Sequence, residues 1–531
     1  MRRHRLHLLG SLLLVAAAGV LTSGAAPQPA GRPASAGPRP LGQVIPAPAS
    51  VTPGGAPYRI TGGTRIHVGG SREAHRIGEY LADLLRPSTG YRLPVTEEGA
   101  GGIRLRLAQG PYGTEGYRLD SGRGGVTITA ARPAGLFHGV QTLRQLLPAA
   151  VERDTVQPGP WLVAGGTVRD TPRYPWRGAM LDVSRHFFTV DEVKRYVDRL
   201  ALYKFNKLHL HLSDDQGWRI AIDSWPRLTT HGGSTEVGGG PGGFYTKDDY
   251  REIVRYAAAR HLEVVPETDM PGHTNAALAS YAGLNCDGVA PPLYTGTAVG
   301  FSSLCAGKEI TYDFADDVIR ELAALTPGRH LHIGGDEAHS TSHADYQAFM
   351  DRVQPIVARY GKTVVGWHQL TGATPAEGAL AQYWGLDGTG AEEKERVAKA
   401  ARNGTGIILS PADRIYLDMK YDRTTPLGLS WAGYVEVKRS YDWDPGAYLP
   451  GVPADAVRGV EAPLWTETLE NSAHLDHMAF PRLPGVAELG WSPAATHDWE
   501  AYRTRLAAQG PRWDALGIGY HRSPQVDWPA G

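Results

Sequence analysis

The chain has 531 residues, of which 42% are hydrophobic and 21% are charged, and its formal net charge is -1. This is a globular composition, long enough for two domains or for one large barrel with an accessory domain. The nearly balanced charge offers no basic excess for binding nucleic acid or an anionic membrane surface.

The first 26 residues have the features of an export signal. A basic segment, MRRHRLH, precedes the apolar run LLGSLLLVAAAGVL, which is shorter than the roughly 20 residues of a membrane span. We expect cleavage near Ala25 or Ala26 and secretion of a protein with no membrane attachment. Arg2-Arg3 alone is weak evidence for twin-arginine export. Residues 27–41, rich in Pro, Gly and Ala, should form a disordered linker.

Residues 42–172 are predicted to form a small α+β accessory domain. Period-two alternation of apolar residues predicts strands in TRIHV, GIRLRLA, GYRLDS and GVTITAA. An apolar face at i, i+3 and i+4 predicts helices in SREAHRIGEYLADLLRPSTG and AGLFHGVQTLRQLLPAA. Nothing in this domain indicates catalysis.

Residues 173–510 alternate strand and helix, and eight strands can be counted. The strand segments are WRGAMLDVSR, NKLHLHLSDD, LEVVPETDM, HLHIGG, TVVGWHQ, ALAQYWG, TGIILSPAD and VRGVEAPLW. Eight strands in βα alternation favour a (β/α)8 TIM barrel over a doubly wound sheet. Residues 511–531 are expected to pack on this barrel as a C-terminal tail.

Polar and aromatic residues gather where the eight strands are expected to end, which is the active-site face of such a barrel. In chain order they are Arg185, Asp214, Asp269 with His273, Asp336 with Glu337, Trp367, Trp384, Tyr416 with Asp418, and Trp465 with Glu467. This convergence predicts an active site.

The pair Asp336-Glu337 follows two glycines in the stretch HIGGDEAH. Two carboxylates at a barrel mouth suggest glycoside hydrolysis, in which the two groups normally flank the bond from opposite sides. Adjacent residues approach from one wall, so they suit another arrangement better. One acid donates a proton, while its neighbour holds a nucleophile that belongs to the substrate, such as the carbonyl oxygen of a 2-acetamido group.

HIGGDEAH resembles the catalytic signature of glycoside hydrolase family 20, the β-N-acetylhexosaminidases. WRGAMLDVSRHFF, KLHLHLSDDQGWR, PETDMPGH, VVGWHQ and APLWTE are similar to its barrel strands, and EGYRLDS with GLFHGVQTLRQLL to its accessory domain. The resemblance implies a retaining exo-enzyme that removes terminal non-reducing N-acetylglucosamine or N-acetylgalactosamine through an oxazolinium intermediate. Chitin oligomers, cell-wall fragments and glycans are the implied substrate classes, and neither a cofactor nor a metal is implied.

The resemblance also implies roles for individual residues. Glu337 would be the general acid and then the base, and Asp336 would accept from the acetamide N–H and stabilise the oxazolinium. Asp214 and His273 would tune Glu337 from behind, and Asp269 would support Asp336.

The implied sugar-binding residues lie around this pair. Tyr416 would donate to the acetamide oxygen, and Arg185 would bind the 3- and 4-hydroxyls. The others are Trp367, Trp384 and Trp465 as walls of the acetamide pocket, Asp418 and Glu467 on the 4- and 6-hydroxyls, and Trp431 flanking the sugar.

Three further predictions concern the two cysteines, a Gly-rich segment and the oligomeric state. Cys286 and Cys305, an even count in an exported chain, predict a disulfide, with two unpaired thiols as the alternative. The Gly-rich residues 230–245 have no Lys/Ser at P-loop spacing and should form a flexible lid or a surface loop. A monomer is the default expectation for the assembly.

The sequence also suggests alternatives to a hexosaminidase. The histidines His209, His211, His332 and His339 invite a metal-hydrolase hypothesis. Metal-dependent barrels, however, place such a pair on the first strand, and here it is on the second. We therefore expect hydrogen-bonded packing inside the barrel or under the helices. A non-catalytic sugar-binding protein would lack one of the acid pair, and chitinase-like barrels space their carboxylates along one strand.

Overall fold

The computed structural model describes residues 37–529, so the expected export signal and residues 27–36 of the linker lie outside the described residues. Residues 37–41 differ from the predicted disordered linker. The Arg39 guanidinium donates to the Ala508 carbonyl over 3.1 Å, and Leu41 is buried. The burial of the apolar Leu41 side chain is enough to hold this segment against the protein.

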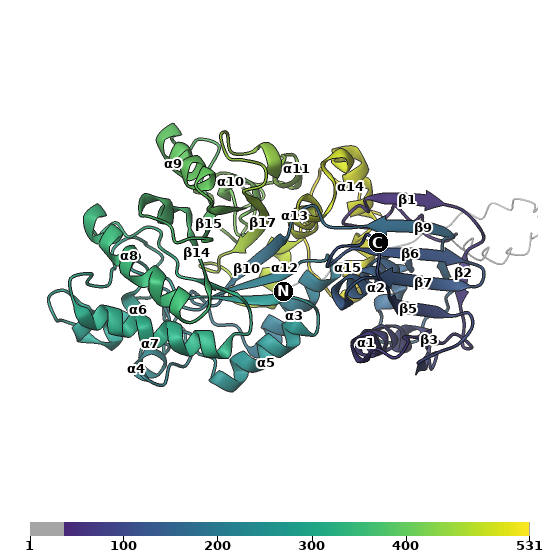
Figure 1. Ribbon diagram of the computed structural model, residues 1–531, viewed down its shortest axis with the longest axis horizontal. Coiled ribbons are helices and arrows are strands. Elements are labelled where there is room, and N and C mark those ends of the chain that lie inside the picture. The colour runs from purple at the N-terminus through teal and green to yellow at the C-terminus, as the bar shows by residue number, and fades with distance from the viewer. Residues whose placement is uncertain (1–36, 530–531) are drawn as a thin grey trace, which may run out of the picture. The chain divides into compact units, whose positions relative to one another are not determined.

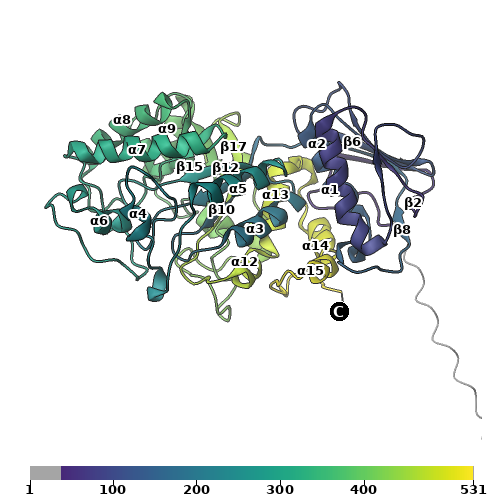
Figure 2. The ribbon, with the colours of Figure 1, turned by 90° about the horizontal axis from the view of Figure 1, so that it is seen from below.

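The accessory domain is built on a seven-stranded mixed sheet in the order β1-β9-β6-β7-β5-β3-β4 (Figure 1). Its strands are β1 (Ser50–Pro53), β3 (Ile66–His67), β4 (Val95–Thr96), β5 (Ile103–Leu107), β6 (Tyr117–Gly122), β7 (Gly125–Ala130) and β9 (Gly166–Asp170), and β2 (Tyr58–Ile60) pairs separately with β8 (Trp161–Val163). Helices α1 (Arg72–Thr89) and α2 (Pro133–Leu146) pack on the sheet and on each other, as Figure 2 shows for α1. The two predicted helices and four predicted strands are confirmed.

The eight predicted barrel strands are confirmed and pair in parallel in chain order, with the last closing on the first. They are β10 (Trp176–Asp182), β11 (Lys207–His211), β12 (Glu263–Glu267), β13 (His330–His332), β14 (Thr363–Trp367), β15 (Leu380–Tyr383), β16 (Gly406–Leu409) and β17 (Val457–Leu464). Nearly every strand residue is buried, because side chains fill the barrel on one face and helices cover the other.

Helices surround the barrel, visible around β10, β14, β15 and β17 in Figure 1. The long ones are α3 (Val190–Leu202), α5 (Lys247–Ala258), α7 (Glu309–Leu325), α8 (His343–Arg359) and α9 (Ala391–Arg402). The shorter ones are α4 (Arg227–Thr230), α6 (Asn275–Ser280), α10 (Ala412–Ile415), α11 (Val437–Tyr441), α12 (Ser472–Ala479), α13 (Arg482–Trp491), α14 (Trp499–Ala507) and α15 (Gly510–Leu516). Capping boxes at Thr189 and Thr246 begin α3 and α5. Between β14 and β15 the structure has only a 3₁₀ turn, η4 (His368–Gly372).

The C-terminal tail contacts more than the barrel. The Trp513 indole N–H donates to the Tyr203 hydroxyl at the end of α3, over 2.7 Å. The Arg512 guanidinium donates to the carbonyl of Leu147, which follows α2 in the accessory domain, over 2.8 Å. The tail therefore joins barrel and accessory domain, whereas the sequence predicted packing on the barrel alone.

Two of the sequence predictions concern loops. The disulfide Cys286–Cys305 is present. In the Gly-rich segment, the buried Arg219 guanidinium donates to the carbonyls of Gly233, Thr235 and Gly243. These bonds hold the segment against the barrel and favour the surface-loop interpretation.

Within residues 37–529, every helix is too short or too polar to cross a lipid bilayer.

Candidate active site

The acid pair lies on the loop from β13 to α8, where two left-handed glycines turn the chain. Gly334 has φ 65° and Gly335 has φ 102°. A Cβ on Gly334 would lie 1.7 Å from Asp269 Oδ1, and the Gly335 N–H donates to that same oxygen over 2.9 Å. Glycine is therefore required, because the backbone passes directly against a carboxyl group. Glu337 itself has φ 44°, a conformation that costs a non-glycine residue roughly 1–3 kcal/mol and marks functional sites.

Gly334→Ala is expected to lower kcat/KM by about 10²-fold or more, because the methyl group displaces Asp269 or the acid pair by close to an ångström. Gly361→Ala is the matched control, since Gly361 has a similar φ of 71° but no atom within 4 Å of the place that a Cβ would take. Both variants should lose some thermal stability, and only the first should lose activity. Similar activity in the two variants would show that the close approach to Asp269 does not matter.

Beside the pair lies a cavity of about 360 Å³, the size range of small-ligand sites. Its lining combines aromatic and charged side chains: Arg185, His273, Thr297, Val299, Asp336, Glu337, Trp384, Tyr416, Leu429, Trp431, Trp465 and Glu467. The Trp431 ring meets the rings of Trp384 and Tyr416 edge-on, with centroids 6.0 and 5.9 Å apart, and is 51% exposed at the rim. None of residues 230–245 lines this cavity, so their interpretation as a lid gains no support.

The other predicted site residues lie behind this lining. Trp367 is fully buried and packs on Trp465, with ring centroids 5.7 Å apart, so it backs the cavity wall and does not line it. Asp214, Asp269 and Asp418 are also buried.

The predicted position of Tyr416 and Asp418 at the end of the seventh strand is wrong. Strand β16 ends at Leu409, and both residues follow the short helix α10. They still reach the site, because the chain turns back after α10 and the Leu417 N–H donates to the Pro463 carbonyl on β17.

Asp336 and Asp269 are two buried carboxyl groups close to each other. Burial, and then the nearby Asp336, raise the pKa of Asp269 well above its usual range, which favours the protonated form of Asp269. Burial also raises the pKa of Asp336, and the adjacent Glu337 raises it further, while His273 opposes both. Asp269 thus leaves Asp336 as the ionised member.

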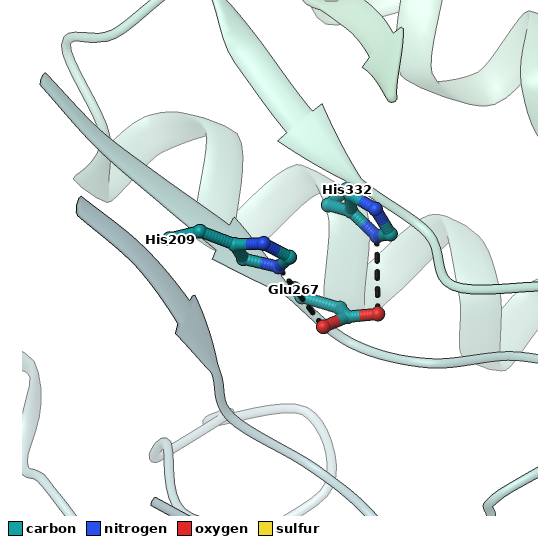
Figure 3. A group of neighbouring side chains, drawn as sticks. All are labelled: His209, Glu267 and His332. Carbon is teal, nitrogen blue, oxygen red and sulfur yellow. Dashed lines mark hydrogen bonds and ion pairs between the residues drawn. The ribbon is translucent and has the colours of Figure 1, made fainter. Parts of the chain in front are cut away.

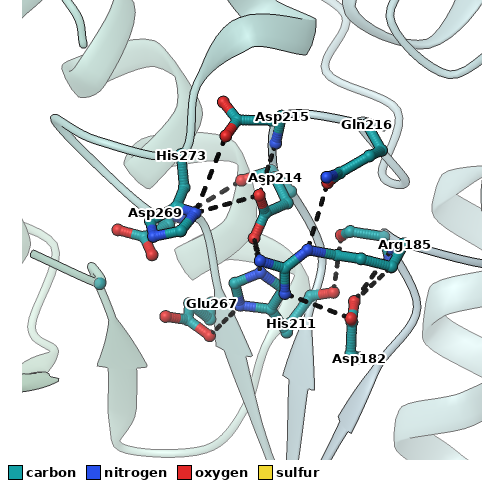
Figure 4. A network of polar contacts seen from close by, with 12 residues as sticks. Asp182, Arg185, His211, Asp214, Asp215, Gln216, Glu267, Asp269 and His273 are labelled. Atoms are coloured by element: carbon teal, nitrogen blue, oxygen red, sulfur yellow. Dashed lines mark hydrogen bonds and ion pairs between the residues drawn. The ribbon is translucent and has the colours of Figure 1, made fainter. Parts of the chain in front are cut away.

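Glu337 contacts His273, and His273 in turn faces Asp214, as Figure 4 shows for the latter two residues. The His273 Nε2 atom lies 3.3 Å from Glu337 Oε2, and its Nδ1 atom lies 3.1 Å from Asp214 Oδ1. Although burial opposes it, Asp214 and Asp336 raise the pKa of His273 well above its usual range. A cationic imidazole therefore lies between Glu337 and Asp214. His273 has φ 55°, a second left-handed residue at the site.

Three further residues at the site are Asp418, Glu467 and Tyr416. Burial, and then Glu467, raise the pKa of Asp418 well above its usual range. Among the described residues nothing donates to Asp418 Oδ2, a buried atom that would suit a ligand hydroxyl. Burial, and then Asp336, raise the pKa of Tyr416 well above its usual range, so its hydroxyl remains a donor.

Two residues that hold Arg185 were not predicted from the sequence. Asp182, the last residue of β10, accepts from the backbone N–H groups of Ser184 and Thr466 and lies 3.3 Å from the Arg185 guanidinium. Gln216 accepts from Arg185 Nε over 3.2 Å. The rule that site residues lie at the ends of the barrel strands would have found Asp182 if the first strand had been predicted to end at this residue. Gln216 gave no such signal.

Three of the four histidines of the metal hypothesis are buried on barrel strands, His209 and His211 on β11 and His332 on β13. His209, Glu267 and His332 cluster in Figure 3. Both ring nitrogens of His209 contact carboxylates, those of Glu461 and Glu267, at 2.7 and 2.9 Å. The His332 Nδ1 atom accepts the Gly334 N–H over 3.1 Å. Hydrogen bonds thus occupy both nitrogens of His209 and one nitrogen of His332, whereas Glu267 Oε1 and His332 Nε2 have no hydrogen-bond partner among the described residues. His339 is exposed on the loop after the acid pair.

A closed (β/α)8 barrel with two adjacent acids beside an aromatic-walled cavity of this size is the architecture of a glycoside hydrolase. Residues 174–494 match the model of the glycosyl hydrolase family 20 catalytic domain, and residues 42–171 match domain 2 of the same family. The chain belongs to glycosyl hydrolase family 20.

Similar proteins agree with this assignment. A beta-N-acetylhexosaminidase of Cellulomonas fimi is 45% identical over 492 residues, covering 92% of this chain and 97% of the relative. The structure of Streptomyces plicatus N-acetyl-beta-hexosaminidase in complex with Thio-NAglucal is 80% identical, with a TM-score of 0.93, and covers 93% of this chain and 99% of that one. A mutant of the S. plicatus enzyme in complex with product (GlcNAc) is 79% identical, with the same TM-score and coverage.

Proposed function

We propose that this chain is a retaining exo-β-N-acetylhexosaminidase that removes terminal non-reducing N-acetylglucosamine or N-acetylgalactosamine by substrate-assisted catalysis. One observation carries the proposal. Asp336 and Glu337, adjacent in the chain, line a single cavity together with Trp384, Trp431 and Trp465. Adjacent carboxyl groups suit a scheme in which Glu337 is the acid and Asp336 holds a nucleophile of the substrate better than one in which two carboxylates flank the bond from opposite sides.

In the first step, the acetamide carbonyl oxygen attacks C1 while the bond from C1 to the leaving oxygen breaks. Glu337 gives its proton to that oxygen, and His273 stabilises the carboxylate that remains. Asp336 accepts from the acetamide N–H and offsets the positive charge of the oxazolinium, and Tyr416 orients the acetamide oxygen. These interactions strengthen as charge develops, so they favour the transition state over the ground state.

In the second step, water attacks C1, Glu337 accepts its proton, and the oxazolinium ring opens to give the sugar with retained configuration. Trp384 and Trp465 enclose the acetamide group, backed by Trp367, and exclude water that would compete with the substrate oxygen.

Recognition of the rest of the sugar falls to the charged residues of the site. Arg185, whose guanidinium lies over the Trp465 ring at 4.8 Å, binds the 3- and 4-hydroxyls. Asp418 and Glu467 bind the 4- and 6-hydroxyls. Trp431, half exposed at the rim, flanks the sugar and offers a face for the next unit of an oligosaccharide.

We also propose that the mature enzyme is secreted and acts as a monomer on chitin oligomers, cell-wall fragments or glycans. The export signal in residues 1–26 supports secretion.

The test uses two chromogenic β-glycosides that differ only at C2, one with an acetamido group and the other with a hydroxyl. Only the acetamido compound should be cleaved, because only it carries the nucleophile. Cleavage of both at similar rates would mean that a protein carboxylate attacks C1, and the role proposed for Asp336 would fall.

A further inference from the structure

A line of alternating carboxylates and imidazoles runs through the barrel interior. The Glu461 carboxylate contacts His209 Nδ1 at 2.7 Å, and His209 Nε2 contacts Glu267 at 2.9 Å. Glu267 contacts His211 Nδ1 at 2.5 Å, and His211 Nε2 contacts Asp214 Oδ2 at 2.7 Å. All five side chains are buried, and Figures 3 and 4 show successive parts of the line.

The line reaches the catalytic acid. Asp214 contacts His273, and His273 contacts Glu337 through its other ring nitrogen. Glu337 is thus the accessible end of a polar line whose other members are shielded from solvent. The roles given above use only the last three groups of this line, Asp214, His273 and Glu337. The groups before them, among them His211 and Glu267, have no role in the mechanism.

His211 must be a cation in this arrangement. Each of its ring nitrogens points at a carboxylate oxygen, and an ionised carboxylate can only accept. Burial opposes the charge, but Glu267 and Asp214 raise the pKa of His211 well above its usual range. Burial opposes ionisation of Glu267, but His211, His332 and His209 hold its pKa well below its usual range.

The other groups around His211 do not cancel this charge. Arg185 lies 2.9 Å from the Asp214 oxygen that also binds His211, so Asp214 lies between two cations. Asp182, next to His211 across the β10–β11 ladder, is paired with Arg185.

Three further neighbours complete the surroundings of His211. The Trp465 ring lies edge-on to the imidazole, with centroids 4.8 Å apart. Burial, and then Asp214, raise the pKa of Asp215, and burial, and then Asp336, raise that of Asp269, so both carboxyls tend toward the neutral form.

We propose that His211 is a positioning residue for the catalytic acid: it holds Asp214 and supplies the buried positive charge that Glu337 senses through His273. This inference rests on the proposed hexosaminidase function. Without the charge on His211, Asp214 is less neutralised and the acid pair experiences more negative charge. Asp336 then keeps its proton to higher pH, so the acid limb of the pH–rate profile moves upward.

The experiment compares the pH dependence of kcat/KM on a chromogenic N-acetylglucosaminide for the wild type, His211→Gln and His209→Gln. The His209 variant is the matched control, since it removes a buried imidazole that contacts Glu267 but not Asp214. Both variants should lower Tm. His211→Gln should move the acid limb upward by on the order of half a unit or more, and the acid limb of His209→Gln should stay close to that of the wild type.

An active His211→Gln enzyme with the wild-type profile, or equal shifts in the two variants, would overturn the proposal. An inactive wild type would instead overturn the proposed function. Should His211→Gln fail to fold, neutron diffraction from wild-type crystals near pH 7.5 decides the matter. Deuterium on both ring nitrogens of His211 is expected, and deuterium on only one would overturn the proposal.

Discussion

Glu337→Gln is expected to lower kcat/KM by about 10²–10⁴-fold on substrates with poor leaving groups, such as N-acetylglucosamine oligosaccharides. A sugar alkoxide cannot leave without a proton, and glutamine supplies none. An activated phenolate leaves unprotonated, so an aryl glycoside should lose much less in its first step. The measurement is kcat/KM on one substrate of each kind.

The contrast between substrates is the informative quantity, because any distortion of the site would lower both rates. Glu309→Gln controls for the loss of a carboxylate. Glu309 lies at the exposed start of α7, where it pairs with Arg352, and its replacement should change neither rate. Equal losses on the two substrates in Glu337→Gln would refute the acid role.

The sequence predicted the barrel well because its strands follow from local patterns, and the structure brings most of the predicted site residues to one cavity. Strands buried on both faces read as short apolar runs, and the residues just beyond them reach one end of the barrel. The glycines before Asp336 marked a tight turn, and the structure shows that Asp269 is the reason for it.

What the sequence could not give are contacts between residues far apart in the chain. The position of His211 on the second strand predicted hydrogen-bonded packing inside the barrel or under the helices, but its partner Glu267 is 56 residues away and nothing local joins the two. Strands β1, β2, β4, β8 and β9 of the accessory domain were missed, and β4 has only 2 residues, too few for an alternation to be recognised. Tyr416 was assigned to a strand end because the helix of 4 residues that precedes it has no detectable period.

Asp336→Asn is expected to lower kcat by about 10²–10³-fold with little change in KM. Asparagine fills the same space and can still accept the acetamide N–H through its carbonyl oxygen, so substrate binding is largely kept. It carries no charge, so it cannot offset the positive charge of the oxazolinium. Because Asp336 is buried, that lost interaction is weakly screened and its effect on the transition state is large.

The pH dependence separates this role from a structural one. Asp336 must be ionised to act, and its pKa is raised by burial and by Glu337. As pH falls through that raised pKa, Asp336 takes up a proton, so wild-type kcat should fall at a higher pH than the value of about 3.9 for a free aspartate would give. Asp336→Asn has no such group to titrate, and its residual kcat should lack this acid limb. Normal turnover in the variant would remove Asp336 from the mechanism. An acid limb that persists in a slow variant would assign the limb to another group, with the coupled Asp269 as the first to examine.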